Sequence, residues 1–425
     1  MTAYWLERAW TGDRVVDGLR VEVAGGTFTS VEEGPADDAE RLAGLTIPGL
    51  ANCHSHAFHR ALRGRTQRER GTFWTWREQM YAVAERLTPD DYLALARAAY
   101  REMVAVGITS VGEFHYLHHG PGGTPYGDPN AMGHALVQAA AEAGLRLALL
   151  DTCYLAAGIG REPEGVQARF SDRTAEAWAE RTAAGPARGA AIHSVRAVPR
   201  DQMKHVVDAA VGRPLHVHLS EQVAENQQCL DAYGVTPTAL LAEAGALGML
   251  TSAVHATHLT DDDVALLGGT GTVACFCPTT ERDLGDGIGP SRRLLEAGSP
   301  LTLGSDSHAV VDLFEEMRAV ELDERLATRQ RGHWSAAELL RAATVDGHRS
   351  IGFTAGRIEA GAPADLVTLD TSSIRTAGTG ADEGTAVFAA GGADVVRVLR
   401  DGVDVTVDPA DVGAELDAVV RRLLA

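Results

Sequence analysis

Two pairs of histidines in this chain are each separated by a single residue, His54 with His56 and His216 with His218. Residues two apart in an extended strand point to the same side, so both imidazoles of a pair can reach one metal ion. An isolated pair is as typical of surface histidines as of a metal site. The first pair follows the apolar run that ends in PGLAN, which favours metal binding. In the second pair we expect one histidine to be a ligand and the other to support it.

A carboxylate completes this set of potential ligands. Asp306 closes the run LTLGSDSH near the end of the chain's central part. Zinc accepts nitrogen and oxygen ligands and, in catalytic sites, keeps one position open for water. The histidine pairs and Asp306 together therefore predict one zinc site with hydrolytic chemistry.

Two further residues stand where proton transfer would be needed. Glu221 lies three residues after His218, a natural place for an acid/base carboxylate beside the metal. His255, in VHATH, is either a buried hydrogen-bonded histidine or a proton carrier for the water molecule. His258 is expected to be structural, and His205 to be a solvated helix residue.

These residues need a scaffold that brings distant segments together. Short apolar runs alternate with helical, Ala- and Leu-rich segments, which is typical of parallel βαβ units. Eight such runs predict an α/β fold, a TIM-like (β/α)8 barrel, in which the active site lies at the carboxyl ends of the strands. The runs are 44–56, 107–115, 146–154, 190–198, 214–221, 251–259, 272–280 and 300–308.

The two ends of the chain have a different pattern. Residues 1–48 and 355–407 contain short β-type runs broken by Gly and Asp, which predict one small β-sandwich domain built from both termini. The barrel then occupies 49–354, and 408–425 reads as an amphipathic C-terminal helix.

Composition narrows the possible partners. The 425 residues carry a net charge of −20, which argues against nucleic-acid and membrane-surface binding. An anionic substrate would need locally placed arginines. The five cysteines are too few for a disulfide framework, and the start of the chain does not resemble a signal peptide, so we expect a cytoplasmic protein. Cys275 and Cys277 are expected to pack in the seventh strand.

The order of these motifs resembles the amidohydrolase superfamily, with HxH, H-x-x-E, a later histidine and a final aspartate. Members with two metals bridge them with a carbamylated lysine at the end of the fourth strand. Here the only lysine is Lys204, in a helical stretch, so the resemblance implies one metal ion per chain.

Within that superfamily, several segments look like those of the formimidoylglutamate deiminases: PGLANCHSHAFHRALRG, FWTWREQMY, EFHYLHH, IHSVRAV, HVHLSEQ, LGDGI and GSDSH. This resemblance implies a homodimer that hydrolyses N-formimino-L-glutamate to N-formyl-L-glutamate and ammonia in histidine degradation. It assigns the metal to His54, His56, His218 and Asp306, and catalysis to Glu221, His255 and Asp306. It assigns substrate contacts to His59, Arg77, Tyr116, His193 and Arg196.

One position departs from the family, which often has glutamine where this chain has His59. The FWTWR segment places three aromatic residues within four positions beside Arg77, and these could form a pocket wall. Arg77 and Arg196 would pair with the two substrate carboxylates, since guanidinium groups bind carboxylates bidentately.

Two alternatives stay open at this point. A deaminase of a purine or another aromatic amine would keep the fold but predicts stacking residues and amide groups where the two arginines stand. A catalytically inactive scaffold is the other alternative, and the intact set of metal and acid/base residues argues against it.

Overall fold

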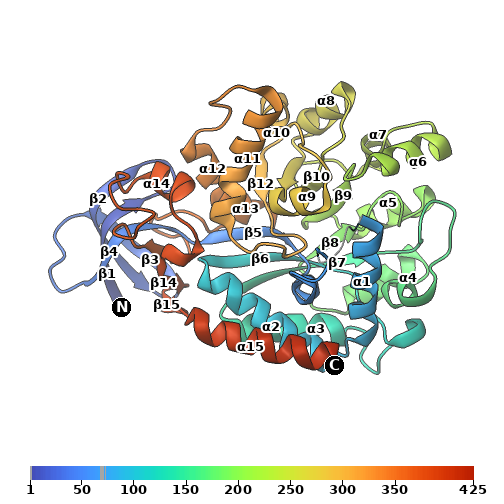
Figure 1. Ribbon diagram of the computed structural model, residues 1–425, viewed down its shortest axis with the longest axis horizontal. Coiled ribbons are helices and arrows are strands. Elements are labelled where there is room, and N and C mark those ends of the chain that lie inside the picture. The colour runs from blue at the N-terminus through green and yellow to red at the C-terminus, as the bar shows by residue number, and fades with distance from the viewer. Residues whose placement is uncertain (1, 68–70, 72) are drawn as a thin grey trace.

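A computed structural model describes residues 2–67, 71 and 73–425, without the side chains of residues 73 and 74. The described residues form two sheets, one of eight parallel strands and one of seven mixed strands. In Figure 1 the mixed sheet lies at one end of the molecule and the parallel strands with their helices occupy the rest.

The eight parallel strands follow one another around the sheet in chain order. Each of the eight predicted runs overlaps one of them, so the predicted TIM-like barrel is confirmed. The strands are β5 (Leu50–Ser55), β6 (Ile108–His115), β7 (Arg146–Cys153), β8 (Gly189–Ile192), β9 (Leu215–Leu219), β10 (Thr251–His255), β11 (Val273–Phe276) and β12 (Leu301–Leu303).

Helices connect successive strands and cover the outside of the barrel (Figure 1). They are α1 (Phe73–Arg86), α2 (Pro89–Ala105), α3 (Ala131–Ala143), α4 (Ala175–Ala183), α5 (Arg200–Ala209), α6 (Val223–Tyr233), α7 (Pro237–Glu243), α8 (Asp261–Thr270), α9 (Pro278–Leu284), α10 (Ser291–Ala297), α11 (Leu313–Thr328), α12 (Ala336–Ala343) and α13 (Val345–Ser350). Several begin at a threonine or serine whose side chain accepts a hydrogen bond from the first turn, as Thr88 does for α2.

Residues of the predicted metal site close the barrel between its first and last strands. A parallel bridge joins Ser55 to Asp306. The amide of His56 donates to the carbonyl of Asp306 at 3.2 Å, and the amide of Asp306 donates to the carbonyl of His54 at 3.0 Å. The backbone that closes the barrel therefore also fixes the distance between these side chains.

The two chain ends form one β domain together, as predicted. Its strands are β1 (Thr2–Trp10), β2 (Val15–Ala24), β3 (Thr27–Glu33), β4 (Glu40–Pro48), β13 (Leu366–Leu369), β14 (Val395–Arg400) and β15 (Val403–Asp404). They make a single sheet in the order β15-β14-β13-β4-β1-β2-β3. A short helix, α14 (Glu383–Phe388), lies between β13 and β14.

The first predicted run, 44–56, is shared between the two sheets, because β4 ends at Pro48 and β5 begins at Leu50. Gly49 is the joint, and a Cβ atom there would lie 2.2 Å from the Thr109 hydroxyl oxygen. Only glycine lets the chain pass this point. From this arrangement we propose that the β domain and the barrel meet at 48/49 and 354/355, and that the C-terminal helix begins after 407.

The predicted C-terminal helix is α15 (Pro409–Leu424), and it packs along α2 (Figure 1). Val412 and Leu416 bury against Ala98. Arg97 and Arg101 of α2 form ion pairs with Glu415, at 2.8 and 2.6 Å. The C-terminal helix is thereby fixed to the barrel by both apolar and charged contacts.

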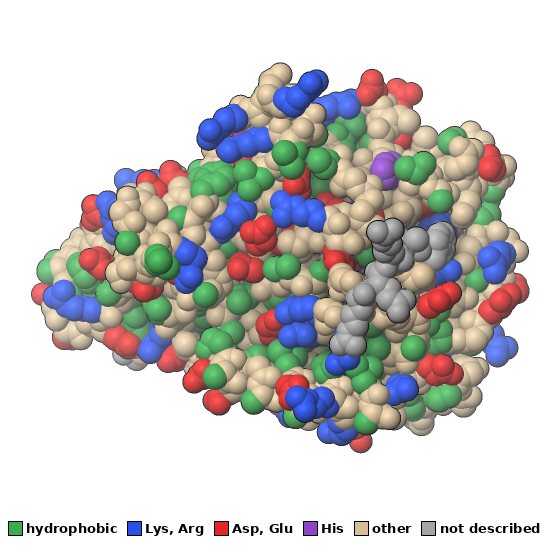
Figure 2. All heavy atoms as spheres, viewed as in Figure 1, with side chains coloured by type: hydrophobic (Ala, Val, Ile, Leu, Met, Phe, Trp, Pro, Cys, Tyr) green, Lys and Arg blue, Asp and Glu red, His purple; other side chains and the backbone are tan. Residues whose placement is uncertain are grey.

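Figure 2 shows acidic and basic side chains interspersed over one face of the molecule, without a large patch of either sign. No helix in the described part of the chain is long and apolar enough to cross a membrane.

Candidate metal and substrate site

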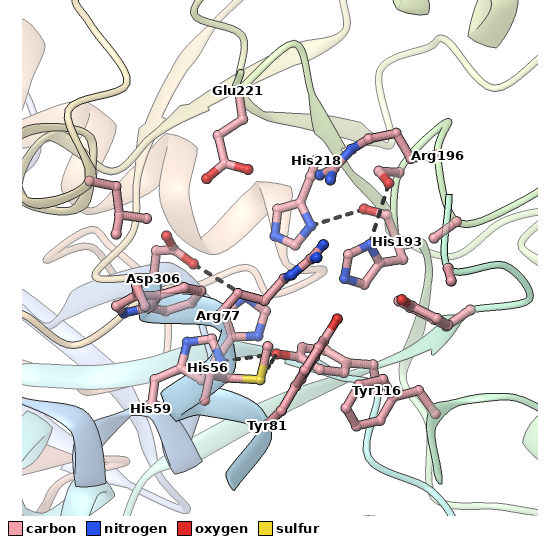
Figure 3. Close-up of a pocket in the computed structure, with 18 of the residues that line it drawn as sticks. His56, His59, Arg77, Tyr81, Tyr116, His193, Arg196, His218, Glu221 and Asp306 are labelled. Atoms are coloured by element: carbon pink, nitrogen blue, oxygen red, sulfur yellow. Dashed lines mark hydrogen bonds and ion pairs between the residues drawn. The ribbon is translucent and has the colours of Figure 1, made fainter. Parts of the chain in front are cut away.

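Four side chains from three strand ends converge on one point. His54 and His56 come from the end of β5, His218 from β9 and Asp306 from the loop after β12, and one ligand atom from each lies within 4.8 Å of the others. The Nε2 atoms of His54 and His56 are each 3.2 Å from Oδ1 of Asp306. Nε2 of His54 is 3.0 Å from Nε2 of His218. Figure 3 shows His56, His218 and Asp306 grouped in this way.

Backbone contacts set the tautomers of two of these histidines. Nδ1 of His56 donates to the carbonyl of Phe114 at 3.0 Å, and Nδ1 of His218 donates to the carbonyl of His193 at 2.9 Å. Each Nε2 atom therefore turns its lone pair toward the shared point. Burial lowers the pKa of His54 to about 3, so its imidazole is neutral as well. Neutral imidazole nitrogens beside a carboxylate are the ligand set that zinc prefers.

This geometry decides which histidine of the second pair, His216 or His218, reaches the metal position. His216 lies deeper in the barrel, where its Nε2 is 3.4 Å from the carbonyl of Ser350, and it is not part of the convergent group. His218 is the member of that pair that reaches the metal position. Lys204 is exposed on α5 and pairs with Asp208 at 2.8 Å, away from the convergent group.

The backbone at this site is held in an unusual conformation. His255 has a φ of 69° and Asp306 a φ of 39°, both in the left-handed region that costs a residue with a side chain about 1–2 kcal/mol. Gly304 precedes Asp306, and a Cβ atom there would lie 2.7 Å from Cβ of His54. The fold thus tolerates strain in order to direct these side chains inward.

Glu221, which follows β9, and His255, at the end of β10, lie beside the convergent group. Nε2 of His255 is 4.0 Å from Oε1 of Glu221 and 3.9 Å from Oδ2 of Asp306. Its Nδ1 donates to Oε1 of Glu281 at 3.3 Å, which fixes the ring. Burial would lower the pKa of His255, but the surrounding carboxylates, Glu221 first among them, raise it well above its ordinary value.

A pocket opens over these groups and contains every substrate-contacting residue that the sequence predicted. Arg77 and Arg196 line it together with Glu221 and Asp306. Figure 3 shows the two carboxylates on one side of the pocket and Arg196 with His193 on the other. Of the predicted aromatic wall, Trp76 lines the pocket, together with aromatic residues of other elements, namely Tyr81, Tyr116, Tyr154 and Phe170. The other two aromatic residues of the FWTWR segment, Phe73 and Trp74, have side chains outside the described part of the chain.

His59, where the family often has glutamine, is buried at the edge of this pocket. Its Nε2 forms a hydrogen bond with the Tyr116 hydroxyl at 2.9 Å, and its ring lies against Trp76 at 5.1 Å between centroids. Burial lowers the pKa of His59 well below its ordinary value, so the ring is neutral. A neutral imidazole can replace an amide as a hydrogen-bonding group here.

A second polar cluster lies at the ends of β6 and β7. His115, His118 and Asp151 also bring potential ligand atoms within 4.8 Å of one another. However, both oxygens of Asp151 accept hydrogen bonds from Arg181 at 2.8 Å, and Trp178 donates to Oδ1 at 2.9 Å. A guanidinium already neutralises this carboxylate, so the cluster is an internal ion pair.

Arg181 is the residue on which that cluster depends. It also pairs with Asp172 at 2.9 Å. Burial by itself raises the pKa values of Asp151 and Asp172. Arg181 and the nearby histidines outweigh that effect, and both pKa values lie below the ordinary range. We expect Arg181→Leu to reduce the free energy of unfolding by about 3–5 kcal/mol, since two buried carboxylates lose their counterion. Urea denaturation at pH 7 measures this, and the exposed Glu180→Ala on the same helix should change it by less than about 0.5 kcal/mol.

The pH dependence of stability provides a second check on this cluster. The stabilisation from a carboxylate whose pKa is lowered in the folded protein is complete above its unfolded pKa and is lost as the pH falls through the folded value. The difference between wild type and Arg181→Leu should therefore shrink in acid. An equal difference at pH 7 and in acid would contradict the assignment of the ion pair.

Three carboxylates near the site were not predicted. Glu113 accepts from the Ser55 hydroxyl at 2.7 Å and from the Ala57 amide at 2.6 Å, so it holds the segment that carries His54 and His56. Glu281 holds His255, and Glu225 lies beside Arg196. The EFH and TTER segments contain Glu113 and Glu281, but nothing in the sequence shows which distant side chain each one meets.

The predictions for His205 and for the two neighbouring cysteines agree with the structure. His205 is exposed on α5, and Cys275 and Cys277 are buried in an apolar cluster inside the barrel. His115 ends β6, and His118 and His119 follow in the loop, all three buried.

Comparisons with known proteins agree with this geometry. Residues 45–405 match the Amidohydrolase family. The chain is 35% identical to the formimidoylglutamate deiminase of Pseudomonas aeruginosa, over 98% of this chain and 97% of that protein. It is 28% identical to a 5-methylthioadenosine/S-adenosylhomocysteine deaminase of Haloarcula marismortui, over 86% of this chain and 82% of that protein. The crystal structure of an amidohydrolase from Brucella melitensis superposes with a TM-score of 0.90 at 30% identity, covering both chains completely. The resemblance predicted from the motifs is confirmed, and the chain belongs to the amidohydrolase family.

Proposed function

We propose that this protein hydrolyses N-formimino-L-glutamate to N-formyl-L-glutamate and ammonia, a reaction of histidine degradation, with one zinc ion per chain. The observation that carries the proposal is the distribution of charge in the pocket. Arg77 and Arg196 line the same pocket as Glu221 and Asp306, with Arg196 and the two carboxylates on opposite sides. The 35% identity to the Pseudomonas aeruginosa deiminase over almost the whole chain supports it.

The charge distribution matches the charges of this substrate. N-formimino-L-glutamate has a basic formimino group on its α-nitrogen, one carboxylate on the adjacent α-carbon and a second carboxylate at the end of its side chain. Guanidinium groups bind carboxylates bidentately, and carboxylates near the metal position would stabilise a cationic formimino group. A neutral substrate would have no carboxylate for these guanidinium groups to bind.

The residues present suggest how the reaction would proceed. A bound divalent metal supplies Lewis acidity and lowers the pKa of a water molecule from about 15.7 to about 7. Glu221 would accept a proton from the attacking water and pass it to the formimino nitrogen, which leaves as ammonia. His255, held by Glu281, and Asp306 would orient the water and take part in the proton transfer. The oxygen remains on the carbon as the formyl group.

A second candidate is deamination of a purine-type substrate. The aromatic lining of the pocket, including Trp76, Tyr81 and Phe170, could stack on a base, and the Haloarcula marismortui relative is named for such a reaction. Ammonia release from N-formimino-L-glutamate, guanine, adenosine and 5-methylthioadenosine, measured beside the metal content of the same sample, separates the candidates. Release from a purine but not from the formimino compound would overturn our proposal.

The substrate role of Arg196 can be tested by substitution. We expect Arg196→Ala to raise KM by roughly tenfold to a hundredfold, because a charge-assisted hydrogen bond contributes about 1.5–3 kcal/mol, while metal content stays at one ion per chain. Arg200→Ala, four residues later in the same connection and exposed, is the matched control. Unchanged KM for Arg196→Ala would reject the assignment.

We also propose that the protein is a cytoplasmic homodimer whose partners are small anionic amino-acid derivatives. The soluble composition, the charge of −20 and the family resemblance support this. Light scattering of the purified protein measures the oligomeric state, and a monomer would contradict the dimer.

A further inference from the structure

Arg196 has a buried neighbour that none of its expected roles explains. Oε2 of Glu225 lies 3.6 Å from Nε of Arg196, and the Glu225 side chain is completely buried. Glu225 lies in the first turn of α6, whereas Arg196 follows β8, so the contact joins two successive βα units. The pair therefore links the arginine to the segment that follows Glu221.

The contact involves only one edge of the guanidinium group. Nε of Arg196 is buried and has no hydrogen bond in the described part of the chain, and neither carboxylate oxygen of Glu225 has one. The guanidinium and the carboxylate are close enough for electrostatic attraction, but they do not form a hydrogen bond. The two Nη atoms also have no hydrogen-bond partner among the described residues, and the side chain lines the pocket. Glu225 thus faces the Nε edge and leaves the Nη atoms for a ligand.

The charges of Arg196 and Glu225 balance each other inside the protein. A buried carboxylate without hydrogen bonds is costly unless a cation lies beside it, and Arg196 is that cation. Burial raises the pKa of Glu225 to about 7 even with Arg196 opposing the shift. A flexible arginine without this neighbour would be free to take other rotamers, and each would point the Nη atoms elsewhere.

We propose that Glu225 is a positioning residue for substrate binding, which holds Arg196 by its Nε edge so that its two Nη atoms receive one carboxylate of the substrate. This inference rests on the proposed function, because it requires Arg196 to bind a carboxylate. Glu225 itself does not line the pocket and would not touch the substrate.

The first test compares binding with turnover. We expect Glu225→Gln to raise KM about tenfold with less than a twofold change in kcat, and to weaken binding of glutarate, a simple dicarboxylate, by a similar factor in calorimetry. Glu225→Asp keeps the charge but withdraws it by one methylene and should give an intermediate effect. Equal affinity for glutarate in wild type and both variants, each folded by circular dichroism, would overturn the proposal.

A double-mutant cycle tests the coupling directly. If Glu225 acts through Arg196, then Arg196→Ala with Glu225→Gln should bind glutarate no more weakly than Arg196→Ala alone. The exposed pair Arg200 and Glu243, 2.5 Å apart, is the matched control, and its substitutions should leave glutarate affinity unchanged. Additive effects of Arg196→Ala and Glu225→Gln would mean that Glu225 acts elsewhere.

Substrates with a single carboxylate separate this proposal from the proposed function. The formimino derivatives of 4-aminobutyrate and 2-aminobutyrate each lack one carboxylate of the glutamate compound. The Glu225→Gln effect should vanish with one of them and persist with the other; an equal effect on both would contradict the proposal. Wild-type protein that binds glutarate but does not hydrolyse the formimino compound would refute the proposed substrate. The double-mutant cycle measured with glutarate would still test the positioning role of Glu225. Wild-type protein that does not bind glutarate would refute the carboxylate role of Arg196 and this proposal together.

Discussion

Replacing Glu221 with glutamine is expected to lower kcat by about 10²–10⁴-fold while the protein stays folded and keeps its metal. An amide has nearly the same shape as a carboxylate, but it cannot accept a proton from water and release it to a leaving nitrogen. Glu221 lines the pocket, and its Oε1 lies 4.0 Å from Nε2 of His255, so the substitution removes a carboxylate that can carry a proton at this site.

This experiment needs three measurements on the same sample: steady-state ammonia release, metal content by mass spectrometry and the melting temperature. Glu243→Gln, an exposed substitution of the same kind on α7, should behave as wild type. Turnover at the wild-type level in Glu221→Gln would remove Glu221 from the mechanism. If the variant lost both its metal and its turnover, Glu221 would belong to the metal site instead.

The second large effect is expected from a matched pair of substitutions on β9. His218→Asn should be purified with far less than one metal ion per chain and should lose more than about a hundredfold in kcat/KM, since changes merely to residues behind a metal ligand already cost 10–100-fold. His216→Asn, two residues earlier on the same strand, should keep one metal ion, because its side chain lies outside the convergent group.

Metal analysis and circular dichroism of both variants check this result. Chelation of wild-type protein should abolish ammonia release, and added zinc should restore it in wild type and in His216→Asn but not in His218→Asn. Full metal content in His218→Asn, or undiminished activity after chelation, would contradict the proposed metal centre.

Much of the scaffold could be predicted because the local pattern and the fold agree. Each barrel strand is a short apolar run, and the polar residues at its carboxyl end have no reason to be there unless they face the barrel mouth. His54, His56, Asp306 and one member of the His216/His218 pair could therefore be predicted from positions far apart in the sequence, whereas the choice of His218 came from the family resemblance. The closure of the barrel through Ser55 and Asp306 could not be predicted in the same way, because it depends on one bridge.

The carboxylates behind the site were missed for a physical reason. Glu113, Glu225 and Glu281 are polar residues whose importance lies in the distant side chain each one meets. Sequence patterns report the periodicity of burial, but they do not report which buried charges lie side by side. The two terminal segments were recognised as β-rich, yet their joining into a single sheet depends on the pairing of β4 with β13.

That pairing has a consequence for the synthesis of the protein. Pro48, at the end of β4, pairs with Leu366, more than 300 positions later. At roughly 5–20 residues per second, a ribosome needs on the order of 15–60 s to reach β13 after completing β4. During that interval an apolar strand has one unsatisfied hydrogen-bonding edge, which neighbouring nascent chains on the same messenger could join. Translation speed and chaperone supply, more than final stability, should therefore govern how much of this protein is recovered intact.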